Sequence, residues 1–289
     1  MPNSLQELQQ LYQRYRRIVF FILLLLIASL IMIFVNRSFS LPILLAAVIF
    51  HLAVLRPCQK KYTTAVTHLN LRRTLCRTLG NDEIAELNGD LITADTLTSA
   101  GLMPCGDESS TPLLRWGLHG ERKGLRVSLC DATIPQNFRL AAKGKRRVHF
   151  NAGVWVHIDL PSDTHLHYRL LDETSVPTPI RMDFFSGKWN YETAHIPDSD
   201  LGKRFVLYRP KNTEQGPSHA LIQKLKALME YTPGYVALSV NSTRLDVFVR
   251  GRFLARAVSV SQKPSQALID LDPFPELDYI LELAKTLLH

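Results

Sequence analysis

"IVFFILLLLIASLIMIFV", from Ile18 to Val35, is the stretch that decides how this chain is organised. It contains no charged residue, and 15 of its 18 residues are Leu, Ile, Phe or Val. At 1.5 Å per residue, a helix of this length spans about 27 Å, close to the thickness of a hydrocarbon core. At about 0.3–0.6 kcal/mol per apolar residue, insertion into a membrane is favoured by about 5–9 kcal/mol. We therefore predict a membrane-spanning helix, because a cleaved signal peptide would have a shorter apolar run followed by small residues.

A second apolar run extends from Leu41 to Leu55. It makes only about 22 Å of helix and is therefore short for a span. Ser40 is placed to cap such a helix, Pro42 fits in its first turn, and Pro57 is expected to end it. The run is either a second span or a re-entrant or interfacial helix, and we favour the second span because cations flank both runs.

The chain reverses between the two runs, since only Asn36–Ser40 separate them. Two spans then form an antiparallel transmembrane helical hairpin over residues 18–55. The cations beside its outer ends are Arg14, Arg16, Arg17, Arg56, Lys60 and Lys61, whereas the connection holds only Arg37. Positive residues stay on the cytoplasmic side, so both termini are predicted to be cytoplasmic. Residues 56–289 then form a cytoplasmic domain.

Residues 1–17 precede the first span and are expected to be a cytoplasmic N-terminal helix. Ser4 and Glu7 have the spacing of a capping box. One face of this helix carries Leu5, Leu8, Tyr12 and Tyr15. We interpret the segment as a continuation of the first spanning helix, with a separate regulatory helix as the alternative.

The remainder of the chain predicts an α+β domain on an antiparallel or mixed sheet. A helix is expected over Gln59–Leu79, with Gly80 as its C-cap. Short segments with a strand pattern follow at residues 113–119, 124–134, 147–151, 153–160, 165–171, 181–185 and 203–209. A helix capped by Ser218, a β-hairpin and a last helix over Glu276–Leu288 complete the order.

The hairpin is encoded by "YVALSVNSTRLDVFVRG", Tyr235–Gly251. Its alternation predicts that Val236, Leu238 and Val240 face Leu245, Val247 and Val249, with residues 241–244 turning the chain.

Four cysteines, Cys58, Cys76, Cys105 and Cys130, contain no CxxC pair. Their spacing excludes a zinc ribbon and a thioredoxin-like motif. In a reducing cytoplasm they are expected to be free and buried thiols.

The order of these elements resembles a family of bacterial membrane-anchored proteins that is defined by a cytoplasmic domain of unknown function. The segments that carry the resemblance are "GLRVSLCDATI" (124–134), "RRVHFNAGVWVHIDLP" (146–161), "LGKRFVLYRP" (201–210) and "VALSVNSTRLDVFVRG" (236–251). It covers residues 56–289 and the hairpin before them, although "FNAG" at 150–153 is one residue longer than the F-x-G of the family. The resemblance implies a multi-pass protein of the bacterial inner (plasma) membrane, and it implies no catalytic residue.

One segment, "GVWVHIDLPSDTHLHYR" from Gly153 to Arg169, raises the question of an active site. A hairpin that pairs Leu160 with Leu166 would put its alternating apolar residues on one core. The opposite face would then gather Trp155, His157, Asp159, His165, His167 and Arg169. Two interpretations follow. Either His157, Asp159, His165 and His167 bind zinc in a membrane-bound hydrolase or metal-dependent enzyme, or they form a solvated polar face with weak pairs. We favour the polar face because Arg169 disfavours a dication.

Other catalytic signatures are missing from the sequence, which has no GxSxG, P-loop, HExxH or GxGxxG after a strand. We therefore expect that the protein is not an enzyme and binds no cofactor, and we assign no catalytic residue.

A basic segment gives the remaining functional signal. Its cations are Arg139, Lys143, Lys145, Arg146 and Arg147, in a chain of net charge +8. On a membrane-tethered domain, such a segment faces anionic headgroups at about 1 kcal/mol per cation. Nucleic acid is a rival partner, but no RNP-like motif supports it, and a solvated loop without ligand is the third interpretation. We predict a module that binds lipid or an unidentified protein partner, and the sequence does not indicate its oligomeric state.

Overall fold

The computed structural model describes residues 4–81, 84, 93–102, 112–139, 146–172, 191–232, 234–255 and 262–288. For residues 94, 95, 98, 135–139 and 146–150 it describes the backbone alone. The chain forms two compact units. The first consists of Met1–Thr74 and Arg256–Asp272, and the second of Leu75–Ala255 and Pro273–His289.

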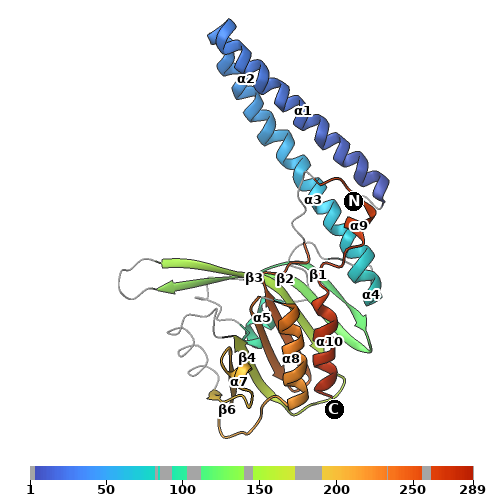
Figure 1. Ribbon diagram of the computed structural model, residues 1–289, viewed down its shortest axis with the longest axis vertical. Coiled ribbons are helices and arrows are strands. Elements are labelled where there is room, and N and C mark those ends of the chain that lie inside the picture. Colours follow the sequence, from blue (N-terminus) through green and yellow to red (C-terminus); the bar gives the residue numbers. More distant parts are fainter. Residues whose placement is uncertain are drawn as a thin grey trace. The chain divides into compact units, whose positions relative to one another are not determined.

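Two long apolar helices open the first unit and pack as an antiparallel pair (Figure 1). Helix α1 runs without interruption over Leu5–Val35, and the Ser4 hydroxyl accepts the N–H of Glu7 at 3.3 Å. The predicted start and the continuation of the N-terminal segment into the apolar run are therefore confirmed. Between α1 and α2 (Arg37–Phe50), the rings of Phe21 and Phe50 lie 5.1 Å apart.

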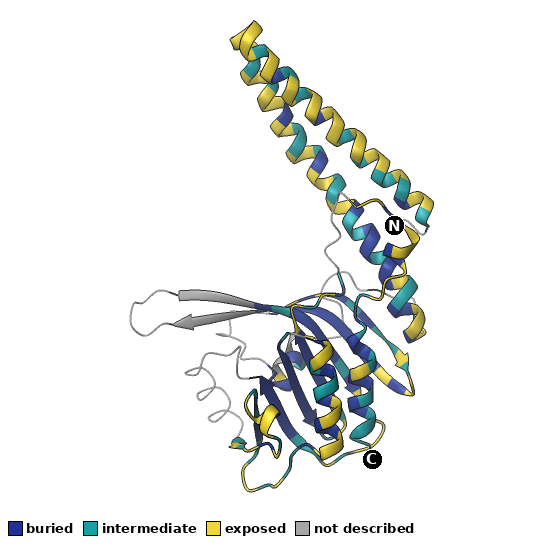
Figure 2. Ribbon diagram, viewed as in Figure 1, coloured by how far each residue is buried: buried dark blue, intermediate teal, exposed yellow. Residues whose placement is uncertain are grey.

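The outward surfaces of these helices are apolar and exposed. Phe20 is 61% exposed, Phe34 85% and Leu41 73%, and Figure 2 shows exposed residues along both helices. An apolar surface of this extent is unfavourable in water. Helix α1 and the continuous helix over Arg37–Leu79, which begins with α2, are each long and apolar enough to cross a membrane.

The second apolar helix begins earlier than predicted. Asn36 is its cap, and its side-chain oxygen accepts the N–H of Ser38 at 3.2 Å. The predicted cap, Ser40, lies within the helix, where its carbonyl accepts the Ser29 hydroxyl at 2.9 Å. Pro42 is likewise inside the helix. Asn36 lies just past the end of α1, so a single residue makes the reversal.

The same helix does not end at Pro57, contrary to the prediction. The segments that continue it are the π-turn η1 (His51–Leu55), α3 (Arg56–Leu71), the π-turn η2 (Arg72–Cys76) and α4 (Arg77–Leu79). Proline has no N–H, and its ring crowds the carbonyl four residues before it, here that of Ala53. The wider π-turn lies at this carbonyl and accommodates the ring. The C-cap at Gly80, with a φ of 68°, is confirmed.

A small core holds the remainder of the first unit together. Its members are Leu8, Tyr62, Ala65, Val66, Leu69, Leu268 and Ile269. The last two belong to helix α9 (Gln266–Ile269), which the sequence did not predict. Asn70, which is 7% exposed, donates to the carbonyls of Ile269 and Leu271 at 2.7 Å each. Its amide therefore fastens α9 to α3.

The second unit contains an antiparallel sheet, with eight strands in the part of the chain that the structure describes. The strands are β1 (Leu113–Arg122), β2 (Leu125–Arg139), β3 (Arg146–Asp159), β4 (His167–Asp172), β5 (Tyr191–Ala194), β6 (Phe205–Pro210), β7 (Val236–Asn241) and β8 (Arg244–Arg250). Their order is β1-β2-β3-β8-β7-β4-β6-β5. The predicted register of the β7–β8 hairpin is confirmed at all three apolar pairs.

The predicted pairing of Leu160 with Leu166 is wrong, because β3 and β4 are not neighbours. The β8–β7 hairpin lies between them. The connection over residues 160–166 arches across the hairpin turn, where Leu160 donates to the carbonyl of Thr243 at 2.8 Å and Ser242 to that of Leu166 at 2.8 Å. Three strand spacings require about 14 Å, and seven extended residues span about 23 Å, so this short connection suffices.

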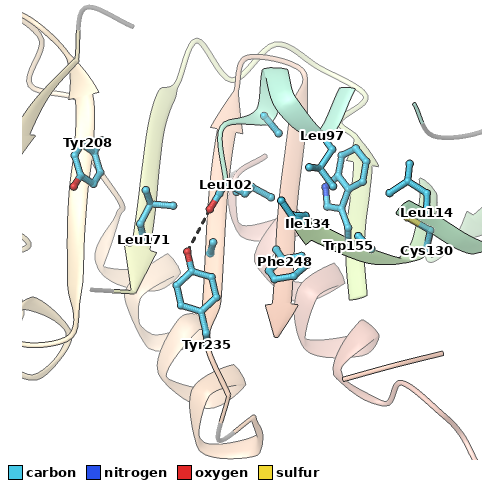
Figure 3. Close-up of a cluster of buried hydrophobic side chains, with 13 residues drawn as sticks. Leu97, Leu102, Leu114, Cys130, Ile134, Trp155, Leu171, Tyr208, Tyr235 and Phe248 are labelled. Atoms are coloured by element: carbon cyan, nitrogen blue, oxygen red, sulfur yellow. Dashed lines mark hydrogen bonds between the residues drawn. The ribbon is translucent and has the colours of Figure 1, made fainter. Parts of the chain in front are cut away.

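Helices cover both faces of the sheet (Figure 1). Helices α8 (His219–Tyr231) and α10 (Glu276–Thr286) lie on one face, and the predicted cap of α8 is confirmed by the Ser218 hydroxyl, which accepts the N–H of Leu221 at 3.2 Å. Helix α5 (Ala94–Ala100) lies on the other, where Leu97 packs with Trp155 and Phe248 (Figure 3). A short helix, α7 (Ser199–Gly202), precedes β6. The fold is α+β, as predicted.

Several predictions concern other parts of the chain. Helix α5 and strand β5 were not predicted, and the expected strand at residues 181–185 lies outside the described residues. Among the cysteines, Cys76 and Cys130 are free and buried as predicted, whereas Cys58 is free but only partly buried. Cys105 lies outside the described residues.

Substitution of Asn70 should release the segment around α9. Asn70→Ala leaves buried carbonyls without a donor, at about 1–3 kcal/mol. We expect the amides of Ile269 and Asp270 to exchange about 5- to 100-fold faster in hydrogen–deuterium exchange. The control is Thr63→Ala, because the Thr63 hydroxyl donates only within α3, to Gln59 and Lys60. Equal exchange in the two variants would contradict a fastening role for Asn70.

Candidate functional site

A row of polar residues crosses the sheet on the face that carries α5. In register from β1 to β6, its members are His119, Ser128, His157, Asp246, Ser239, Arg169 and Tyr208. We call these seven residues the polar row. They come from seven different strands, so the row exists only through the strand order.

The carboxylate of Asp246 is the centre of the polar row. It is 2% exposed and accepts two hydrogen bonds on one oxygen. Trp155 Nε1 donates to it at 3.2 Å and His157 Nδ1 at 2.8 Å. A buried carboxylate requires such donors, because an ionised group without partners is strongly destabilised in the interior.

His157 lies between two carboxylates. Its Nε2 is 3.3 Å from Asp159, which is half exposed, while its Nδ1 contacts Asp246. Burial lowers the pKa of His157, but the hydrogen bond to Asp246 and the charges of Asp246 and Asp159 outweigh it. The net effect raises the pKa of His157 above its ordinary value of 6.5. The two carboxylates therefore stabilise the imidazolium form of His157 relative to that of an isolated histidine.

Arg169 occupies the buried part of the polar row, with only 5% exposure. Its guanidinium lies 4.7 Å from the centre of the Tyr191 ring. Gly101 has a φ of 63°, and a Cβ there would lie 2.6 Å from Arg169 Cζ, so only glycine permits this approach. Burial lowers the pKa of Arg169, and the charges of Tyr191 and Asp246 oppose that effect.

An open polar depression of about 540 Å³ lies beside the other end of the polar row. Its lining includes Ser128, Asp159, Arg126 and His119. Asn81 Nδ2 lies 2.8 Å from His119 Nε2 and closes one side. The lining mixes cations, carboxylates and neutral donors, and no single ligand charge is favoured by it.

The order Ser128, His157, Asp246 is that of a nucleophile, a base and an orienting acid. In a working relay, the second ring nitrogen of the histidine faces the serine. Here that nitrogen, Nε2, faces Asp159. A raised pKa also disfavours the neutral imidazole that would accept a proton. This geometry does not support a nucleophilic relay.

The four residues that could have bound zinc do not converge. His157 and Asp159 are adjacent on β3, but His167 lies on β4 opposite Asn241, beyond β8 and β7. His165 is 87% exposed and lies 3.4 Å from Asp163. Within the described ranges, no group of three or more His, Cys, Asp or Glu side chains could hold a metal ion.

The alternative of a solvated polar face is also wrong in part. Asp159 and His165 are exposed, but Trp155 and Arg169 are buried and His157 is largely covered. The sequence analysis missed Ser128, Ser239 and Asp246, because their relation to His157 depends on the pairing of β3 with β2 and β8. Asp246, a charge inside a strongly apolar hairpin, was the available signal.

Strands β2 and β3 extend beyond the sheet as an arm (Figure 1), and Arg139, Arg146 and Arg147 of the basic segment lie at its end. Beyond Thr133 on β2 and before Ala152 on β3, the two strands pair with each other over six rungs. Six rungs extend about 20 Å from the sheet. We call residues 134–139 and 146–151 the β2–β3 arm.

The last rung of the β2–β3 arm pairs Arg139 with Arg146, and the rung before it pairs Phe138 with Arg147. Lys143 and Lys145 lie outside the described residues. Like charges directly opposite each other destabilise an antiparallel ladder. The arm therefore has a concentration of positive charge at its end, where this charge destabilises the pairing of the two strands.

Comparison of the sequence with protein-family models and with curated proteins, and of the fold with solved structures, gives no significant match. The architecture of two long apolar helices before an antiparallel sheet domain agrees with the resemblance at that coarse level.

The protonation of His157 can be followed through Trp155, whose ring centre lies 6.3 Å from that of His157. In protein labelled with 5-fluorotryptophan, we expect the ¹⁹F signal of Trp155 to titrate with a midpoint above 6.5. Asp246→Asn should lower the midpoint more than Asp159→Asn, because Asp159 is exposed to solvent screening. The signal is assigned with Trp155→Phe, and His157→Gln should abolish the titration.

The same shift has a consequence for stability. Since the pKa of folded His157 is raised, its contribution to the free energy of unfolding is full below about pH 6.5. It is lost as the pH rises through the folded pKa. Chemical unfolding of the wild type and of His157→Gln is measured at pH 5.5 to 8.5. The difference between their free energies of unfolding should become smaller as the pH rises. A difference that widens with pH would contradict the assignment.

Proposed function

We propose that the protein is an inner-membrane-anchored interaction module whose cytoplasmic α+β domain binds anionic headgroups through the β2–β3 arm. The observation that carries the proposal is the last rung of the arm, where Arg139 is paired with Arg146. A ladder that places like charges opposite each other gains from an anion bound between them.

The membrane anchor in this proposal consists of α1 and α2. Their length and hydropathy meet the requirements of a span. The bacterial inner membrane as the location comes from the resemblance of the sequence to a family of membrane-anchored proteins. The cytoplasmic side comes from the cations at the outer ends of the hairpin, such as Arg17 and Arg56.

Anionic headgroups are favoured over other partners by the position of the domain in this proposal. A domain tethered to the cytoplasmic leaflet is held within reach of a negative surface, and each cation near that surface contributes about 1 kcal/mol. Nucleic acid would also attract the arm. It remains an outcome of the experiment, as does an unidentified protein partner.

The topology is tested by reporter fusions after Lys61 and after the C-terminal residue. We expect cytoplasmic reporter activity from both fusions, because cations flank both outer ends of the hairpin. Periplasmic activity from either fusion would overturn the two-span, cytoplasmic-domain topology.

The arm is tested with the full-length protein in nanodiscs of zwitterionic lipid, by co-sedimentation with vesicles of graded acidic-lipid content. Replacing Arg139, Arg146 and Arg147 by Gln removes about 3 kcal/mol of attraction, so the affinity for acidic vesicles should fall by up to about 100-fold. The attraction should also fade as the Debye length shortens from about 10 Å at 0.1 M salt to about 3 Å at 1 M.

The matched control removes three exposed cations elsewhere in the second unit. Lys203, Lys211 and Lys224 are exposed, and their replacement by Gln makes the same change in net charge. It should leave vesicle binding nearly unchanged. Equal losses in both variants, or equal binding to neutral and acidic vesicles, would reject the arm as a lipid contact. Arm-dependent binding of a DNA or RNA duplex without vesicle binding would assign the arm to nucleic acid.

A further inference from the structure

The end of the β2–β3 arm offers a more specific geometry than a diffuse positive charge. Arg139 and Arg146 are direct cross-strand partners in the last rung that the structure describes. Directly opposed residues of an antiparallel ladder have Cβ atoms about 4.5–5.5 Å apart. The register therefore places two arginines directly opposite each other at the end of the arm.

The anion that suits two guanidinium groups is a terminal phosphate. Each guanidinium is a planar fork that donates two parallel hydrogen bonds. A phosphate monoester has three terminal oxygens and a charge of about −1.5 to −2 at pH 7, so it can accept from two forks. A carboxylate or a phosphodiester has only two free oxygens and one charge, so it gains less from a second fork than a phosphate monoester does.

Arg147 differs from the opposed pair although it is adjacent in sequence. Its cross-strand partner is Phe138. It adds to the charge of the arm, but no second arginine lies opposite it in the ladder. Arg147 is therefore the internal control for the contribution of charge alone.

We infer that Arg139 and Arg146 form a binding site for a phosphate monoester at the end of the β2–β3 arm. The inference rests on the proposed function, in which the arm binds anions, and it names the anion. The phosphate is carried by a lipid headgroup or by a soluble ester, and the chemistry of recognition is the same for both.

The test uses full-length protein in zwitterionic nanodiscs and two kinds of vesicle. One contains phosphatidic acid, a phosphomonoester, and the other phosphatidylglycerol, a phosphodiester, at matched surface charge. We expect the wild type to prefer phosphatidic acid by about tenfold or more. The preference should grow from pH 5.5 to 7.5, because a phosphomonoester loses its second proton near pH 6.

Single and double variants separate the site from its charge. Arg139→Gln, Arg146→Gln and the double variant should each lose the preference to the same extent, since either residue alone breaks the clamp. Arg147→Gln should weaken binding to both vesicles equally and keep the preference. Arg139→Lys should keep the general attraction and lose the preference, because an ammonium group has no fork.

Competition with inorganic phosphate at constant ionic strength identifies the source. Displacement at millimolar phosphate favours soluble esters as the natural ligand, and resistance favours headgroups; both outcomes support the site. Equal affinity for the two vesicles with additive effects of all three arginines would overturn the site and leave the proposed function intact. Vesicle binding that none of these substitutions affects would overturn both.

Discussion

The pairing of β3 with β8 is the constraint on which the site depends. It places Asp246 beside His157 and Trp155 Nε1 within hydrogen-bonding distance of the same carboxylate. A hairpin between β3 and β4 would instead have placed His157 near His165 or His167. The choice between these pairings is made by residues 236–249, whose two strands are apolar and joined by a two-residue turn. The contacts within such a hairpin are local in sequence, and the hairpin occupies the position beside β3 that β4 would otherwise have taken.

The polar row contains buried charged groups, and groups of opposite charge lie near them. Asp246 and Arg169 are both almost fully buried, and the charge of Asp246 opposes the lowering of the Arg169 pKa by burial. His157 connects the buried Asp246 to the surface, because its imidazole ring lies between Asp246 and the half-exposed Asp159. Removing one member of such a network is costlier than replacing the whole, since it leaves a buried charge without its partner. The polar row therefore fixes the register of the central strands in addition to any ligand chemistry that the depression beside it supports.

The sequence predicted most of the elements, because their signals are local. The apolar run of α1, the cap at Ser218 and the register of the β7–β8 hairpin all depend on residues within a few positions of each other. The failures have a different origin. The π-turn before Pro57 shows that a long helix can absorb a proline when its preceding carbonyl is moved aside. The arch over residues 160–166 shows that a seven-residue connection is long enough to pass two strands. The local sequence pattern predicts neither the continued helix nor the long connection. The polar row depends on that connection, because it allows β8 and β7 to lie between β3 and β4.

Strand length explains why the sheet has an arm. Strands β2 and β3 have 15 and 14 residues, whereas their outer neighbours β1 and β8 have 10 and 7. Among the residues that the structure describes, the excess length of β2 pairs only with that of β3. A two-stranded ribbon on its own is marginally stable in water, and a like-charged rung at its end weakens it further. Gly153, at the root of the arm, allows the backbone of β8 to approach closely: a Cβ there would lie 2.2 Å from the carbonyl oxygen of Val249. The sheet thus holds the base of the arm firmly, whereas the opposed arginines at its far end weaken the ladder there. In the function proposed above, a bound anion supplies the stability that the ladder lacks at this end, because it neutralises the two like charges.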